Sequence, residues 1–381
     1  PYHIYMEPGG VCMNQLFRWN QTGLFLLALA AGILPFAVPE VCAAALREGL
    51  TLCSGPLLLS LFPFLVVSRL LIQCPESDLL ALPFRLAAWG IGIRTPCAAR
   101  VLCIGFLGGF APAASAAAQA VRTGQLTAEE ADALLPACIC SGPSFVVLTV
   151  GQSLLGSAEL GVLLFASQIT ANYLTAALLN RFAGVRSVKP GSAAPASPAP
   201  PRLDEILADA AITYCKLCGF ILFFRMLAAG AGALLPAGAG TLCAVLLEVC
   251  SGCDLASRTG RWGSLLCCAA LSVQGLSVLL QVRTICPPEM TLRPLYRSRL
   301  LHLPLSLALF YLLLPGGEAD VFSTLPARVL LMRRVPPDCA LLVFAVCCMA
   351  ACALRSGIRQ VEQKQMARNA GGCCINSKTL L

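Results

Sequence analysis

The stretch from Cys103 to Val147 constrains this chain most, because small residues, prolines and a Ser-Gly-Pro turn interrupt its apolar sequence twice. A polar hairpin separates the two apolar arms, and Thr127 with Glu130 three residues later matches a helix-capping box. Inside a bilayer an unpaired backbone group is costly, so interrupted helices occur where protein or a cavity surrounds them. We therefore predict that this stretch forms half of a solute site.

The composition is that of a helical membrane protein. Hydrophobic residues make up 57% of the chain and charged residues only 12%, against about 25% charged in a soluble domain. The apolar residues form long runs instead of alternating with polar ones, which excludes an outer-membrane barrel. The net charge of +8 comes from Lys and Arg near the ends of these runs, so it indicates membrane orientation and not nucleic-acid binding. The first apolar segment follows Arg18 without a cleavage site, so we expect a retained span.

A Pro/Ala/Ser-rich linker divides the chain into two halves. The predicted parts are an N-terminal segment with a first span (1–39), a first gate-like repeat (40–183), the linker (184–202), a second gate-like repeat (203–315), and a C-terminal span with a basic cytoplasmic tail (316–381). The predicted fold class is an all-α polytopic membrane protein with about eight spans, built from two pseudo-repeated halves with broken or re-entrant helices.

Three local predictions follow from the same apolar patterns. We expect one helix from Glu40 to about Ile72, kinked at its prolines, and an interfacial helix within residues 75–96. Between Gly263 and Val282 the sequence predicts one unbroken apolar helix.

The second half contains its own polar break, LLEVCSGCDLAS, which echoes CICSGPS of the first half. A charge that faces lipid costs at least about 2.5 kcal/mol, so Glu248 in this break should be buried, paired or protonatable. Proton coupling, contact with the opposite loop, and an ion pair with Arg258 or Lys216 all remain open. Asp254 could instead cap the next segment.

Polar side chains on two apolar helices are further candidates. Gln274, Ser277 and Gln281 are spaced to share one helix face, which could contact substrate or hydrogen-bond to another helix. Arg225 could point inward as an anion ligand or extend to the membrane interface.

The two CxxC pairs, Cys215/Cys218 and Cys250/Cys253, do not indicate a metal centre. Zinc needs about four ligands in tetrahedral reach, and both pairs lie in apolar segments of a Cys-rich sequence. No nucleophile with a base, no paired carboxylates and no phosphate loop is recognisable. We expect no enzymatic activity, no catalytic residue, no metal and no cofactor.

The order of these motifs resembles the sporulation integral membrane proteins of the YlbJ type, which carry the nucleoside-recognition or gate domain. The resemblance is carried by Gly108-Gly109-Phe110-Ala111, by Gly124-Gln125-Leu126-Thr127 with Glu129-Glu130-Ala131, by Ile139-Cys140-Ser141-Gly142-Pro143, by Leu247 to Gly252, by Gly275 to Gln281, and by Arg299-Leu300-Leu301-His302. The chain departs from the family pattern where an Asn pair is Ile139-Cys140, a Thr is Cys250 and a His is Leu279.

The resemblance implies a multi-pass protein of the bacterial inner membrane, located in the membrane around the forespore. It also implies transport of a small anion, dipicolinate, during endospore formation. A nucleoside or other small-solute transporter, and a non-transporting scaffold of a sporulation complex, are the alternatives. Expected partners are the small anion, the lipid bilayer, and a second copy or other sporulation membrane proteins. The candidate substrate-binding residues are Gly109, Phe110, Ser141, Gly142, Ser144, Arg225, Glu248, Ser251, Gly252, Gln274, Ser277 and Gln281.

Overall fold

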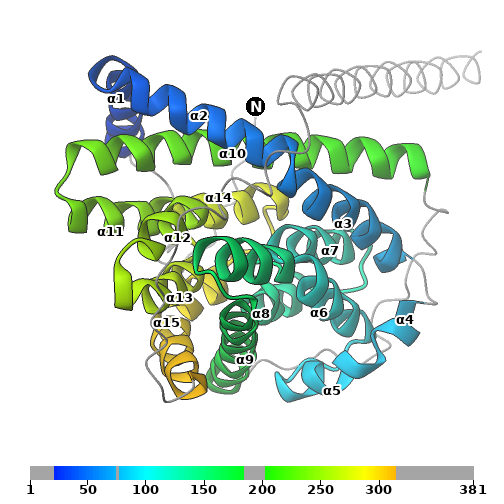
Figure 1. The fold of residues 1–381 in the computed structure, drawn as a ribbon. Coiled ribbons are helices and arrows are strands. Elements are labelled where there is room, and N and C mark those ends of the chain that lie inside the picture. The colour runs from blue at the N-terminus through cyan, green and yellow to red at the C-terminus, as the bar shows by residue number, and fades with distance from the viewer. Residues whose placement is uncertain (1–20, 74–76, 184–201, 315–381) are drawn as a thin grey trace, which may run out of the picture.

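The computed structural model describes residues 21–73, 77–183 and 202–314, and every regular element in these ranges is a helix (Figure 1). The predicted all-α class is therefore confirmed for this part of the chain. The predictions for residues 1–20, for the linker up to residue 201 and for the C-terminal span and tail at 316–381 lie outside the described residues.

The first three helices follow one another closely: α1 (Gln21–Ala37), α2 (Pro39–Ser54) and α3 (Pro56–Gln73). The helix predicted from Glu40 to about Ile72 is interrupted at Gly55, between α2 and α3 and directly before Pro56, one of the prolines at which we expected a kink. Proline has no N–H for the helix ladder and disfavours helical geometry in the residue before it, here Gly55. The chain changes direction at this position.

The long helix α10 (Leu203–Leu234) runs beside α2 across the molecule (Figure 1). Two ion pairs hold it there: Arg69 on α3 lies 2.6 Å from Asp209, and Arg225 lies 2.7 Å from Glu48 on α2. In both pairs the arginine side chain is almost buried and the carboxylate is mostly exposed. The segment α2–α3 and α10 are thus tied at two separate points.

Two short helices, α4 (Ser77–Leu80) and α5 (Leu82–Gly90), occupy the region where we predicted one interfacial helix within 75–96. Large apolar side chains project from both into the surroundings: Leu79, Leu80, Leu82, Leu86 and Trp89 are all more than half exposed. Such a surface suits the boundary between lipid and water.

The interrupted stretch of the first half forms four helical arms. These are α6 (Pro96–Gly108), α7 (Phe110–Arg122), α8 (Ala128–Cys138) and the π-helix η2 (Ser144–Leu154). The predicted capping box at the start of α8 is confirmed: the Glu130 N–H donates to Thr127 Oγ1 at 3.1 Å, and the Thr127 N–H donates to the Glu130 carboxylate at 3.2 Å. We call α6–α7 and α8–η2 the first pair of broken helices.

A second pair of broken helices follows α10. It consists of α11 (Ala237–Leu247) with α12 (Val249–Ser257), and of α13 (Gly263–Val273) with α14 (Gly275–Ile285), with the 3₁₀ turn η3 (Gly260–Trp262) between them. The predicted unbroken helix from Gly263 to Val282 is wrong, because Gln274 adopts a left-handed conformation with φ of 62° and separates the two arms.

Two continuous helices, α9 (Ala158–Ala183) and α15 (Arg293–Leu313), pack against each other beside these arms (Figure 1). The π-helix η2 packs against α9 so closely that a Cβ added at Gly151 would lie 2.5 Å from the Gly161 Cα. The two backbones are in direct contact there.

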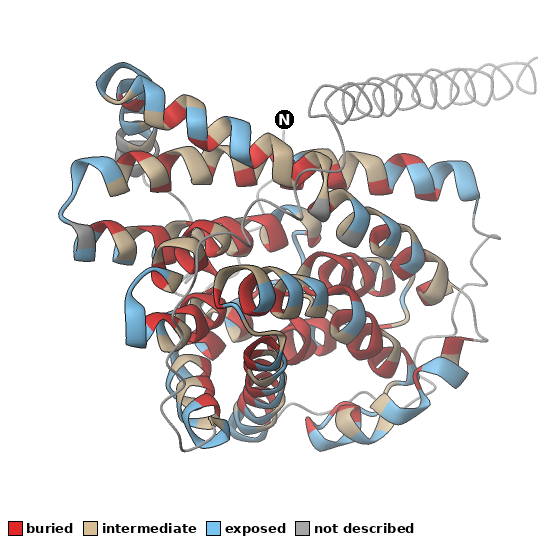
Figure 2. Cartoon of the chain, in the orientation of Figure 1, coloured by how far each residue is buried: buried red, intermediate tan, exposed pale blue. Residues whose placement is uncertain are grey.

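Burial separates inner from outer helices (Figure 2). Most residues of α7 and α8 are buried, although these helices consist largely of alanine and other small side chains. By contrast, α1 and α5 carry mostly exposed or half-buried residues. The short arms therefore form the centre of the molecule and the longer helices surround them.

Four segments of the described chain are long and apolar enough to cross a membrane: Pro39–Leu59, Ala158–Ala183, Leu203–Leu234 and Gly260–Ile285. Shorter apolar helices include Pro96–Gly108, Ser144–Leu154 and Gly238–Leu247. These segments support the expectation of a helical membrane protein. By length and composition the described residues contain four candidate spans, fewer than the eight predicted.

Asp132 on α8 should contribute strongly to stability, because it joins two distant parts of the chain. Its carboxylate accepts from the Thr291 N–H at 2.8 Å, the Thr291 hydroxyl at 2.6 Å and the Leu292 N–H at 3.0 Å. Asp132→Ala removes the partner of these donors, including the buried Leu292 N–H, so we expect the free energy of unfolding to fall by about 1–3 kcal/mol. Denaturant titration of the purified protein in detergent measures the change.

The control is Asp204→Ala, which removes an exposed pair with Arg202 at 3.0 Å. Exposed pairs contribute about 0–1 kcal/mol. Equal loss of stability in the two variants would contradict the bridging role of Asp132.

Candidate functional site

The two breaks of the first pair touch each other. Gly109 separates α6 from α7 with φ of 81°, and a Cβ at this position would lie 2.6 Å from the Gly142 nitrogen. Only glycine combines this backbone conformation with so close a neighbour. The structure therefore brings the predicted residues Gly109 and Gly142 together, while Ser141 is buried beside them.

The remaining first-half candidates border this contact. Phe110 begins α7 and packs half-buried against the core, and Ser144 begins η2 with an exposed side chain. We expected small residues and prolines to interrupt the helix over several residues here, but the chain is helical from Phe110 onward. The interruption is confined to Gly109, because one residue with positive φ is sufficient to redirect the chain.

The breaks of the second pair also touch. Gly275, between α13 and α14, has a φ of 69° and packs against the break between α11 and α12. A Cβ added at Gly275 would lie 2.9 Å from the Glu248 nitrogen. Glu248 itself has an extended backbone between α11 and α12. The two pairs thus use the same arrangement, with a glycine of one broken helix against the interrupted backbone of the other.

Glu248 is 2% exposed and caps α12. Its carboxylate accepts from the N–H groups of Cys250 at 2.8 Å and Ser251 at 2.7 Å, and from the Ser251 hydroxyl at 2.9 Å. A carboxylate is favourable at this end of a helix because the N–H groups there are unpaired and carry partial positive charge. The predicted candidates Glu248 and Ser251 are therefore direct partners.

Glu248 forms neither of the two ion pairs that we considered, with Arg258 or with Lys216, in the described part of the chain. Arg258 instead pairs with Asp254 at 2.6 Å, and no cation among the described residues lies within ion-pair distance of Glu248. Gly252 lies within α12, where a Cβ would come within 2.8 Å of the Val245 Cα. It therefore allows α11 and α12 to pack closely.

Gln274 connects the second pair to the first. Its side-chain amide donates to the carbonyl oxygen of Ile139, in the break after α8, at 3.2 Å. Asn172 on α9 lies 3.4 Å from the same carbonyl oxygen. Gln274 is 1% exposed, and its Oε1 has no hydrogen-bond partner among the described residues. The interruptions of both pairs therefore meet at one buried polar point.

Arg299 on α15 lies beside this point and is 8% exposed. Its guanidinium donates to Asn172 Oδ1 at 3.3 Å, to the Ser272 carbonyl at 3.5 Å and to Ser298 Oγ at 3.3 Å. These contacts are long, and within the described ranges no carboxylate pairs with Arg299. A buried cation without a counter-ion is costly, so this position is suited to an anion.

A buried polar cluster extends from Arg299 between α9, α13 and α15. Gln168 donates to Ser272 Oγ at 3.0 Å, and Ser272 and Ser306 share a hydrogen bond of 2.5 Å. The ring nitrogen Nε2 of His302 lies 3.2 Å from the Gln168 carbonyl oxygen, while Nδ1 has no partner among the described residues. His302 is fully buried, so it lies within the protein interior and not at its surface.

Ser277 and Gln281 on α14 do share a face, as predicted, and the Gln281 amide donates to Ser277 Oγ at 2.9 Å. Gln274 does not continue this stripe, because its left-handed backbone places it outside the helix. Arg225 is engaged with Glu48, as described above. The described residues contain no group of three or more His, Cys, Asp or Glu side chains that could hold a metal ion.

Sequence reasoning missed the contribution of polar residues on α9, α13 and α15 to this site. The missed residues are Gln168, Asn172, Ser272, Arg299 and His302. The signal was present as polar residues at helical spacing in apolar segments, Gln168 with Asn172 and Arg299 with His302. In the sequence, Arg299 and His302 contributed only to the family resemblance. Their place in the site could not be predicted, because Asn172, which Arg299 contacts, is more than a hundred residues away along the chain.

Gly109→Ala should destabilise the protein, because alanine in a left-handed conformation costs about 1–2 kcal/mol and its Cβ would also overlap the Gly142 backbone. The matched control is Gly219→Ala on α10, where no atom lies within 4 Å of an added Cβ. There alanine should stabilise the helix by about 0.5–1 kcal/mol. Thermal unfolding of both variants in detergent measures the difference, and equal midpoints would contradict the contact between the breaks.

No protein-family model, curated protein or solved structure matches this chain. The resemblance to sporulation membrane proteins therefore stays a prediction from the motifs.

Proposed function

We propose that this protein is a membrane transporter of a small anionic metabolite, which binds between the broken helices beside Arg299. One observation carries the proposal: a buried guanidinium without a described counter-ion lies where the interruptions of both pairs meet. The hydrogen bonds that Arg299 makes are long and lead to neutral groups. An incoming carboxylate would provide shorter, charge-assisted bonds and would balance the buried charge.

The broken helices support a position for this site within the membrane. The arms contain 11 to 13 residues, apart from the nine-residue α12. At about 1.5 Å per residue such arms span only about 16–20 Å, short of the roughly 30 Å hydrocarbon layer. Two consecutive arms therefore make one crossing with its interruption at depth. In this proposal the two pairs are two repeats, which together with the continuous helices give about eight crossings.

Transport can occur by alternating access, in which one repeat moves against the other around the site. At the site the two halves are linked by a few neutral hydrogen bonds, among them Gln274 to the Ile139 carbonyl oxygen and Gln168 to the Ser272 hydroxyl. A single neutral hydrogen bond contributes only about 0.5–1.5 kcal/mol. Such a link can be exchanged for contacts with a substrate without large loss of stability. The mechanism requires no bond chemistry, no cofactor and no enzymatic residue.

The motif resemblance narrows the anion to dipicolinate, moved across the bacterial inner membrane or the membrane around the forespore during endospore formation. This aromatic dicarboxylate carries two groups that a guanidinium binds well. Gln274, Asn172 and Gln168 can donate or accept around the ring. A second copy of the chain or other sporulation membrane proteins are the proposed protein partners.

A nucleoside or another neutral solute is the second candidate, and the amide side chains favour it. Gln274 and Gln281 each have a side-chain oxygen without a partner among the described residues. Such oxygens suit the N–H and O–H donors of a nucleoside better than a carboxylate. Under a third interpretation, a non-transporting scaffold, the polar cluster would only hold helices together.

Arg299→Gln should lower dipicolinate uptake into proteoliposomes by about ten- to a hundredfold, because a charged hydrogen bond contributes about 1.5–3 kcal/mol. Arg299→Lys retains the charge and should keep part of the activity. The matched control is Arg297→Gln, two residues away on the same helix with an exposed side chain, which should leave uptake unchanged. Labelled dipicolinate gives the rate, and thermal unfolding shows that each variant is folded.

Equal uptake by the Arg299→Gln and Arg297→Gln variants would exclude Arg299 from the site. Thermal stabilisation separates the remaining interpretations, because a bound ligand raises the unfolding temperature. Stabilisation by nucleosides but not by dicarboxylates would favour the second candidate. If neither ligand stabilises the protein and no uptake occurs, the scaffold interpretation would be supported.

A further inference from the structure

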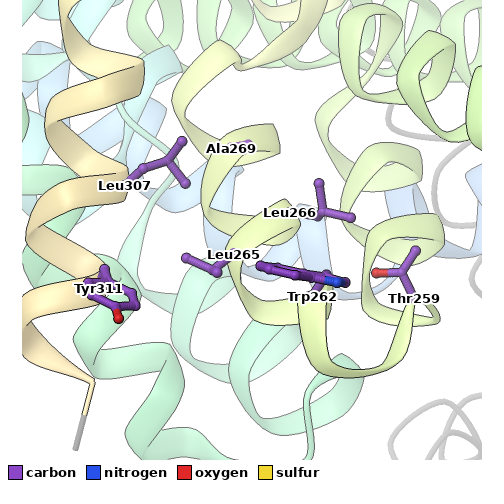
Figure 3. Close-up of a pocket in the computed structure, with 7 residues that line it drawn as sticks. All are labelled: Thr259, Trp262, Leu265, Leu266, Ala269, Leu307 and Tyr311. Atoms are coloured by element: carbon purple, nitrogen blue, oxygen red, sulfur yellow. The ribbon is translucent and has the colours of Figure 1, made fainter. Parts of the chain in front are cut away.

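A groove lies on the outer side of the molecule between the start of α13 and the end of α15 (Figure 3). Its walls are formed mainly by Trp262, Leu265, Leu266, Ala269, Leu307 and Tyr311, and its volume is about 480 Å³. That volume lies within the range of small-molecule sites, about 300–1,000 Å³. The groove belongs to neither break and has no role in the proposed transport.

The lining of the groove is apolar, and a positively charged side chain borders one end of it. Thr259 lines this end, and the guanidinium of Arg261 stacks on the Trp262 ring at 5.0 Å from the ring centre. α13 begins directly after Trp262, at Gly263, and the partial positive charge at the N-terminal end of this helix adds to that of Arg261. Arg261 is exposed, and in the described part of the chain it has no carboxylate partner. This end therefore attracts an anionic group.

The charged end lies at the boundary of a membrane segment. The apolar segment Gly260–Ile285 begins one residue before Arg261. Trp262 and Tyr311 are more than half exposed on either side of the groove, and tryptophan and tyrosine are typical of the interface between lipid and water. From this boundary the apolar wall of Leu265, Ala269 and Leu307 runs along the two helices toward the hydrocarbon.

We propose that this groove binds an anionic phospholipid, with one acyl chain along the apolar wall and the phosphate beside Arg261. The position of Arg261 and the apolar wall together favour this lipid. Arg261 lies at the level of the lipid headgroups, and the apolar wall extends from there along the path of an acyl chain. An apolar protein segment would fill the wall but would leave Arg261 without an anion.

Trp262 reports on the groove directly. The chain contains three tryptophans, so Trp19→Phe with Trp89→Phe leaves Trp262 as the only one. This protein is reconstituted into vesicles in which either phosphatidylglycerol or phosphatidylcholine carries brominated acyl chains, which quench tryptophan fluorescence on contact. We expect half-maximal quenching at an about five-fold lower mole fraction of brominated phosphatidylglycerol, as expected for about one basic side chain near the headgroup.

Arg261→Gln in the same background should abolish this preference, and Arg261→Lys should retain it. The matched control is Arg293→Gln, an exposed arginine at the opposite end of α15, which should leave the preference unchanged. Higher ionic strength should weaken the preference in the unsubstituted groove, which tests the charge without altering the fold. Equal quenching by the two lipids would overturn the headgroup site, and absence of quenching by either would show that protein covers the groove.

Discussion

The structure depends on one constraint, that backbone groups freed inside a membrane must find partners within the protein. The chain satisfies this constraint by packing the break of one broken helix against the break of its neighbour. Gly109 lies against Gly142 in the first pair, and Gly275 lies against the Glu248 backbone in the second. The Glu248 carboxylate accepts hydrogen bonds from the N–H groups at the start of α12, and the Gln274 amide donates to the Ile139 carbonyl oxygen. Each interruption is therefore part of the packing of another.

This solution gathers polar groups at one depth and explains why the site lies there. Four helix interruptions leave oriented N–H and C=O groups in the interior, and the continuous helices α9 and α15 add Asn172 and Arg299 beside them. The surrounding core consists of small and apolar side chains, so the field of the buried guanidinium is weakly screened. Under the proposed function, charge and dipoles would recognise a solute at this position more than shape would.

The sequence was most informative where a single residue type determines local geometry. The Thr127–Glu130 cap, the Ser-Gly-Pro break and the acidic break at Glu248 were all predictable, because each rests on contacts within a few residues. Gln274 was a predicted candidate, but its left-handed backbone and its place in the break were missed, since a left-handed glutamine has no local signature and its partner is 135 residues away. Arg299 was missed for the same reason: its role follows from Asn172, which only tertiary packing brings near. Long-range contacts decide both cases.

The π-helix η2 has a consequence for motion. Wide helical turns of this kind are rare and usually short, yet η2 extends from Ser144 to Leu154 immediately after the first interruption. It lies with its backbone against that of α9 at Gly151 and Gly161, with no room for a side chain between them. Its unusual winding is thus braced from outside, and the same helix α9 carries Gln168 and Asn172. In the proposed transport cycle, a shift of the break after α8 would therefore also move the polar groups on α9.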